Sequence, residues 1–240
     1  MDSLLTVHRR YGYLAAITSG NRDKSAVAEY LGKSSSTVRK HLGELADLGV
    51  VEETDDGYTL TKYGEVVRAN LKDAELAYEA EEIIEALDAP AEVLSQGRYV
   101  PSRKHVPNST IGEIGEHVKN ADTVRGLVPV LFPPYLGTYH GQVLDGLDAE
   151  FVMEREVLEH IRDEHGDLMD EASQNGTRFF VTDSNLSHGL ALLDEHRVGV
   201  LVYDDDGHVL GRASFASRSA REHFEAMYEG CKENAERFEP

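Results

Sequence analysis

The first sixty residues alternate between short stretches with helical spacing and breaks rich in glycine and serine. Apolar residues recur every three or four positions over 4–18, 26–31 and 38–48, which is the spacing of one face of an α-helix. Residues 50–60 then show two short strand-like segments around a turn at 54–57. This order predicts three helices followed by a β-hairpin.

A longer stretch with helical spacing follows the hairpin. Residues 62–87 contain no proline, and Val67, Leu71, Tyr78 and Ile84 belong to a loose apolar stripe among acidic residues. A continuous helix here would measure roughly 39 Å at 1.5 Å per residue. One helix cannot bury such a stripe alone, so we expect it to pair with the same helix of a second copy. The alternative is packing within its own chain.

Beyond residue 111 the chain alternates between helical and strand-like patterns. This alternation predicts an α/β sheet with helices on its faces. Helices are expected at 111–120, 135–146, 156–174 and from Ser217 or Ser219 onward, and strands at 123–131, 150–153, 178–182, 189–193, 198–203 and 208–215. The intervening 95–110, with the basic residues Arg98, Arg103, Lys104 and His105, is expected to be a loop.

The negative charge of the chain is unevenly distributed along the sequence. The 240 residues carry 24 Lys and Arg against 44 Asp and Glu, a net charge of −20, with 16 Arg to 8 Lys and no Trp. Such a composition is typical of proteins adapted to molar salt, where a Debye length of about 3 Å screens self-repulsion. Residues 1–62 have a net charge of only −1 and residues 63–240 a net charge of −19. A polyanion is therefore expected to approach the first segment.

Several classes of protein are disfavoured. A single cysteine, Cys231, excludes an intramolecular disulfide framework and a cysteine-rich zinc site, and it falls on an apolar helical stripe. No His or Cys pair has metal-ligand spacing, so we expect neither a metal nor a cofactor. No apolar run reaches about 18 residues, and the start of the chain lacks the features of a signal peptide. A cytoplasmic protein without a membrane partner is expected.

Four segments in the N-terminal part resemble archaeal and bacterial winged helix-turn-helix transcriptional regulators. They are 26–32 (AVAEYLG), 36–42 (STVRKHL), 45–51 (LADLGVV) and 57–64 (GYTLTKYG). The resemblance implies a DNA-binding winged helix that covers about a quarter of the chain.

Further segments are similar to the C-terminal domain of euryarchaeal methanogenesis and archaellum filament regulators, a family expanded in haloarchaea. They are 133–135 (PPY), 156–158 (EVL), 180–183 (FVTD), 189–194 (GLALLD) and 199–204 (GVLVYD). This resemblance implies a sensor or dimerisation domain. The whole chain is then expected to be α+β, with a winged helix-turn-helix domain at 1–61, a connecting and dimerisation helix at 62–89 and an α/β regulatory domain at 90–240.

Helix-turn-helix proteins place the start of their second motif helix against base edges in the major groove. The corresponding residues are Ser35, Ser36, Thr37, Arg39, Lys40 and His41. Phosphate contacts are expected from the nearby cations Arg9, Arg10, Lys24 and Lys33. The alternative for both sets is a solvated polar surface. The tip of the predicted hairpin, Asp55 and Asp56, is acidic and is not expected to grip phosphates.

A ligand site is expected beyond the first strand of the sheet, since ligands of open α/β sheets lie at the carboxyl ends of strands. The candidates there are Tyr135, Tyr139 and His140, and the alternative is a packed aromatic corner. His188 is a fourth candidate. With Asp194 it loosely resembles the His-x-Lys…Asp motif of phospholipase D-like enzymes, but Leu190 replaces the lysine that steadies phosphoryl charge.

Together these features predict a homodimeric, sequence-specific DNA-binding transcriptional regulator of a halophilic archaeon that is not an enzyme. Its second domain would respond to a small-molecule effector. Two alternatives remain: a degenerate phosphodiesterase-like enzyme, and an effector-binding module whose winged helix binds protein.

Overall fold

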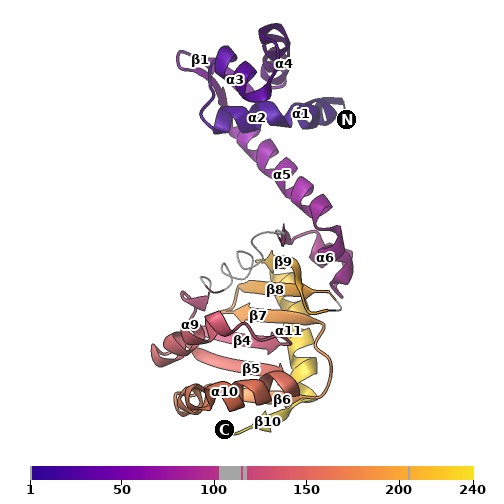
Figure 1. Cartoon of the computed structure of the whole chain (residues 1–240). Coiled ribbons are helices and arrows are strands. Elements are labelled where there is room, and N and C mark those ends of the chain that lie inside the picture. The colour runs from indigo at the N-terminus through magenta and orange to yellow at the C-terminus, as the bar shows by residue number, and fades with distance from the viewer. Residues whose placement is uncertain (1, 103–114, 116–117, 205) are drawn as a thin grey trace. The chain divides into compact units, whose positions relative to one another are not determined.

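The computed structural model describes residues 2–102, 115, 118–204 and 206–240, and it separates into two compact units, Met1–Glu75 and Leu76–Pro240 (Figure 1). The sequence predicted three segments, whereas the boundary in the structure falls near the end of the helix after the hairpin. Each unit has its own apolar core. In the described part of the chain, no helix combines the length and apolarity needed to span a membrane.

The first unit holds helices and one hairpin in the predicted order. Its elements are α1 (Asp2–Arg9), α2 (Tyr11–Thr18), α3 (Lys24–Leu31), α4 (Ser35–Asp47), β1 (Val51–Thr54), β2 (Gly57–Leu60) and α5 (Lys62–Glu79). The segment 4–18, expected as one helix, is two helices because Arg10 leaves helical geometry, with φ −107° and ψ 10°. The β1–β2 hairpin is the wing of a winged helix.

Local signals in the sequence explain where the helices begin and end. The Asp23 carboxylate accepts hydrogen bonds from the backbone N–H groups of Ser25 and Ala26, both at 2.9 Å, and so caps α3. Gly32 ends that helix in the left-handed region, with φ 60°. The Ser34 hydroxyl accepts a hydrogen bond from the Thr37 N–H and caps α4.

The core of the first unit joins all of its elements. Its largest fully buried side chains are Tyr13, Leu14, Val27, Val38, Leu42 and Leu45, and Val67 and Leu71 of α5 pack against this cluster. α5 starts so close to β1 that a Cβ on Gly64 would lie 1.8 Å from the Val50 carbonyl oxygen. Only glycine fits at this crossing.

The second unit is built on one eight-stranded sheet with the order β10-β6-β5-β4-β7-β8-β9-β3. β4, β5 and β6 are parallel, and the remaining neighbours are antiparallel. The strands are β3 (Arg98–Pro101), β4 (Thr123–Val128), β5 (Asp148–Glu154), β6 (Arg178–Thr182), β7 (His188–Leu193), β8 (Arg197–Tyr203), β9 (Val209–Phe215) and β10 (Glu236–Phe238). The helices are α6 (Glu81–Ala86), α7 (Ala91–Leu94), α9 (Pro133–Leu144), α10 (Arg155–Gln174) and α11 (Arg218–Glu233).

Helices cover both faces of this sheet. α9 and α10 lie on one face, and α11 crosses the other (Figure 1). The α11 face buries Leu192, Val200 and Phe224 together with Ile83 of α6. The predicted α+β class and the α/β architecture of the second part are confirmed.

Several elements differ from the expectation. The predicted helix 62–87 is interrupted at Ala80, with φ −102° and ψ 21°, so that α5 and α6 are separate helices. Arg98 lies in β3 rather than in a loop, and the last helix ends at Glu233 because the chain returns as β10. Arg103, Lys104, His105 and most of the expected helix 111–120 lie outside the described residues.

Candidate nucleic-acid interface and ligand cavity

The predicted recognition helix is α4, and one of its faces is exposed. Ser35, Ser36, Arg39 and Lys40 are solvent-exposed, whereas Val38 and Leu42 are fully buried in the core of the unit. Thr37 is half-buried, and its hydroxyl is 2.8 Å from that of Ser34. The helix therefore presents hydroxyl and cationic groups along the side away from its core.

His41 lies on the flank of α4 and contacts the first unit's own core. Its Nδ1 atom and the Tyr13 hydroxyl share a hydrogen bond at 2.7 Å, and the two rings meet edge to face with centroids 5.3 Å apart. Burial, reinforced by the charge of Arg10, lowers the pKa of His41. The imidazole thus acts as a contact between α4 and α2.

The predicted phosphate partners differ in how far they are engaged. Arg10 hydrogen-bonds Glu44 through Nε and Nη2, both at 3.2 Å. Lys24 pairs with Glu53 at 2.8 Å, and Lys33 lies over the Tyr13 ring at 5.1 Å. Arg9 is exposed at the end of α1. Lys33 and Arg9 leave their charge available to solvent, whereas Arg10 and Lys24 are held by carboxylates.

The wing carries negative charge. Asp55 and Asp56 are exposed at its tip, and Glu52 and Glu53 are exposed on β1. No Lys or Arg occurs between residues 51 and 60. The positive groups of the unit therefore lie outside its wing.

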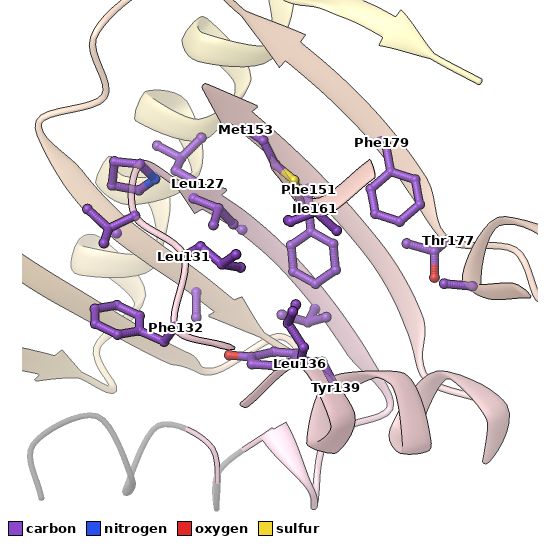
Figure 2. Close-up of a pocket in the computed structure, with 18 of the residues that line it drawn as sticks. Leu127, Leu131, Phe132, Leu136, Tyr139, Phe151, Met153, Ile161, Thr177 and Phe179 are labelled. Carbon is purple, nitrogen blue, oxygen red and sulfur yellow. The ribbon is translucent and has the colours of Figure 1, made fainter. Parts of the chain in front are cut away.

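A cavity of about 180 Å³ lies in the second unit between α9, α10 and the adjacent face of the sheet (Figure 2). Its walls are largely aromatic and aliphatic, with Phe132, Leu136, Phe151, Ile161, Phe179 and Leu201 among the lining residues. None of the described lining residues is an Asp, Glu, Lys or Arg. The cavity is thus an apolar compartment with a few neutral polar groups.

Those polar groups come from both the helices and the sheet. Burial raises the pKa of Tyr139 to about 12 and also raises the pKa of Tyr203, so both phenols stay protonated at neutral pH. Thr177 is 5% exposed, and its hydroxyl has no hydrogen-bond partner among the described residues. His140 Nε2 lies 3.0 Å from the Glu171 carboxylate.

The four predicted ligand residues do not share one site. Tyr139 and His140 line the cavity. Tyr135 belongs to α9, but its side chain lies outside the described residues. His188 is the first residue of β7. It points to the same face of the sheet as Leu190 and Leu192, which pack against α11 on the side opposite the cavity. It is buried, and burial lowers its pKa.

Sequence reasoning missed much of the cavity. Tyr203, Thr177, and Gly126 and Gly199 on the sheet were not singled out. Glycine inside a strand often marks close approach of a ligand or backbone, and that signal was present in the sequence. His165 also lines the cavity, where α10 departs from helical geometry with φ −143° and ψ 31°.

One exposed acidic group could hold a cation by geometry. Ligand atoms of Asp204, Asp206 and His208 lie within 4.8 Å of one another in the β8–β9 turn. The Asp204 carboxylate already accepts hydrogen bonds from the N–H groups of Asp206 (3.0 Å) and His208 (2.8 Å). These bonds account for the cluster as part of the turn.

The fold defines a two-unit protein in which a winged helix precedes an α/β unit. Residues 107–234 match the family model of the methanogenesis regulatory protein FilR1, middle domain, and residues 1–83 match that of the HVO_A0261 N-terminal domain. The first match covers more than half of the chain, and the chain belongs to this family of regulatory proteins. The predicted resemblance is confirmed.

Solved structures offer only distant likenesses. The archaeal chromatin protein TrmBL2 is 14% identical, with a TM-score of 0.48 and coverage of 95% of this chain and 92% of that one. The phospholipase D family member Nuc from Salmonella typhimurium is 10% identical, with a TM-score of 0.41 and coverage of 54% and 91%. Such likenesses say nothing about activity. No curated protein matches the sequence.

Proposed function

We propose that this protein is a transcriptional regulator that binds double-stranded DNA with α4 in the major groove. The observation that carries the proposal is the exposed face of α4, where Ser35, Ser36, Arg39 and Lys40 lie opposite the buried Val38–Leu42 stripe. Arg and Lys side chains donate hydrogen bonds to guanine O6 and N7, and Ser hydroxyls serve bases or phosphates. Membership of a regulatory family supports this reading.

Phosphate contacts are assigned to the cations around α4. Arg9 and Lys33 retain exposed charge, whereas Arg10 and Lys24 would first have to leave Glu44 and Glu53. The acidic wing would contact DNA weakly or through backbone N–H groups. The groove-reading helix is therefore assigned the base contacts, and the cations around it are assigned the phosphate contacts.

In vitro selection of duplexes from a random library by the full chain tests the proposal. We expect enrichment of one motif made of two half-sites about 34–36 Å apart, because a symmetric dimer presents two recognition helices. A library that stays random after repeated rounds would show that the winged helix does not read DNA.

The homodimer is proposed to form through the first unit. Most of the stripe expected to pair between copies is used internally, since Val67 and Leu71 pack on the first core and Ile84 on the second. Large apolar side chains nevertheless stay exposed on α1 and α5: Leu4 59%, Leu5 47%, Tyr63 60% and Val66 60%. Exposed apolar patches are characteristic of interfaces, and a two-fold axis would bury the same residues on both copies.

Val66→Glu is expected to convert the dimer to a monomer, because it places a charge in the apolar contact. Sedimentation velocity of the full chain in concentrated KCl measures the change. Lys72→Gln alters the net charge equally at another exposed position of α5 and should leave the dimer intact. A variant that sediments like the wild type would move the interface elsewhere.

The protein is further proposed to act in concentrated salt, with a small-molecule effector bound in its second unit. Raising KCl normally weakens DNA binding steeply, because each neutralised phosphate releases a counterion. Here added cations also screen the −19 charge of residues 63–240. We therefore expect a shallow or inverted dependence of operator affinity between about 0.2 and 2 M KCl, followed by fluorescence anisotropy. A steep monotonic loss of affinity would contradict the proposal.

A further inference from the structure

We infer that the cavity between α9, α10 and the sheet binds a small neutral ring compound that carries a single hydrogen-bonding group. The inference rests on the proposed function only in treating this compound as the effector. The binding site itself follows from the size, charge and polar groups of the cavity.

The size of the cavity suits a ligand of one ring or two fused rings. The volume is about 180 Å³. For comparison, an engineered cavity of about 150 Å³ lined by Leu, Ile and Phe binds benzene.

The described lining offers no acidic or basic group to pair with a charged ligand, apart from two histidines. A carboxylate or phosphate would therefore lose its hydration without a strong counter-charge. Burial of an ionised group without a partner is highly unfavourable. His140 is moreover placed 3.0 Å from Glu171, whose negative charge would repel an anion.

Aromatic side chains and small residues of the sheet line the cavity together. Gly126, Ala191 and Gly199 lie side by side in register on β4, β7 and β8, and the ring of Phe151 lies against Gly126. Phe132 stacks on Tyr203 with an interplanar angle of 19°. A planar ring can lie against these residues and contact the rings that surround it.

Neutral hydroxyls offer the ligand its hydrogen bond. Figure 2 shows Tyr139 with its hydroxyl end directed toward the side of the cavity where Phe132 lies. Tyr139 and Tyr203 line the cavity, and within the described residues the buried Thr177 Oγ1 has no hydrogen-bond partner. Buried polar groups are usually hydrogen-bonded, so a ligand with one donor or acceptor would complete the site.

Indole is a suitable probe because the chain contains no Trp. Its fluorescence can be excited selectively, and transfer into an apolar cavity shifts its emission to shorter wavelength. We expect saturable binding of one indole per chain to the full-length protein, with no binding of benzoate at the same concentration. Absence of a saturable shift, or equal binding of benzoate, overturns the inference.

Three variants locate the site. Ala191→Leu fills the cavity from the sheet and should abolish binding. Tyr139→Phe should weaken it about three- to tenfold through loss of one hydrogen bond, while the matched change Tyr78→Phe, at a side chain that is 85% exposed, should have no effect. If Ala191→Leu fails to fold, Thr177→Val serves as a second test, because it removes the buried hydroxyl while preserving the shape of the side chain. It should weaken indole binding. Wild-type indole affinity in both Ala191→Leu and Tyr139→Phe overturns the assignment.

DNA affinity is measured on the same preparations without indole. A wild-type protein that binds indole but not DNA would refute the regulator proposal and leave the cavity assignment standing. A wild-type protein that binds DNA but not indole would refute the cavity assignment and leave the regulator proposal standing. The two failures are therefore distinguishable.

Discussion

Glu150→Gln is expected to destabilise the second unit by about 2 kcal/mol, because it breaks an ionic cluster around a buried carboxylate. Glu150 is only 5% exposed in β5. It accepts hydrogen bonds from Tyr228 (2.6 Å) and Lys232 (2.6 Å) of α11 and from Arg178 (2.9 Å) of β6. Glutamine keeps the shape but leaves Lys232 and Arg178 without this negative charge. The carboxylate therefore ties α11 to the sheet.

The single cysteine reports this change directly. Cys231 is half-buried on α11, next to Lys232, so its labelling by a thiol reagent in increasing denaturant follows the opening of the second unit. We expect the Glu150→Gln midpoint to fall well below the wild-type midpoint. Glu159→Gln removes the same charge from an exposed position on α10 and should leave it nearly unchanged. Equal midpoints for all three proteins would show that the cluster does not hold α11.

The effect should depend on pH with a definite sign. Burial alone would raise the pKa of Glu150, but the hydrogen bonds from Lys232, Tyr228 and Arg178 outweigh it and lower the pKa from 4.5 to about 2. A group whose pKa falls on folding stabilises the protein above its unfolded pKa and loses that contribution as pH falls toward its folded pKa. The stability difference between wild type and Glu150→Gln should therefore shrink from about pH 4.5 downward. Using a difference cancels the titration of the other acidic groups.

The winged helix could be predicted because its signals are local. Asp23 caps the start of α3 with its side chain, and Gly32 ends the helix with its left-handed backbone; both signals act within a few residues. The spacing of Val38 and Leu42 separates the buried and exposed faces of α4. The break at Ala80 has no comparable signal. Leu71 belongs to the core of one unit and Ile83 to the core of the other, so tertiary packing overrides an otherwise continuous helical pattern.

Two edge strands escaped prediction for a similar reason. β3 pairs Arg98–Pro101 with β9, and β10 pairs Glu236–Phe238 with β6. Each is three or four residues long, and its partner lies far away in sequence. Such short segments have too few residues to show an alternating pattern, so pairing rather than composition defines them.

The candidate sites show the same division between local and long-range information. The exposed polar face of α4 follows from helical spacing. The hydrogen bond between His41 and Tyr13 joins residues 28 positions apart, so helical spacing does not predict it. The cavity gathers Tyr139 from α9, Thr177 from the turn between α10 and β6, and Tyr203 from β8. Tyr139 and His140, from the segment after the first parallel strand, line the cavity. His188 falls on the other face of the sheet because alternate residues of β7 point in opposite directions.

Combined replacement of Arg39 and Lys40 by alanine is expected to weaken operator binding at least tenfold. Each well-placed contact to a base edge contributes about 1–3 kcal/mol of discrimination, and the two residues are neighbours on the exposed face of α4. Arg39 is exposed, and Lys40, with 73% of its side chain exposed, approaches Glu44 only at 4.0 Å. Folding should change by no more than about 0.5 kcal/mol, as is usual for exposed substitutions.

Fluorescence anisotropy with the selected duplex, at one fixed KCl concentration, measures the loss. The control is Lys72→Ala combined with Arg218→Ala, which removes two exposed positive charges that belong to α5 and α11. If Arg39 and Lys40 read bases, the α4 variant loses affinity for the operator more than for a scrambled duplex, while the control variant changes both equally and slightly. If they only neutralise phosphates, both duplexes weaken alike, because phosphate contacts carry no direct sequence information. Unchanged affinity of the α4 variant for the operator would remove α4 from the DNA interface altogether.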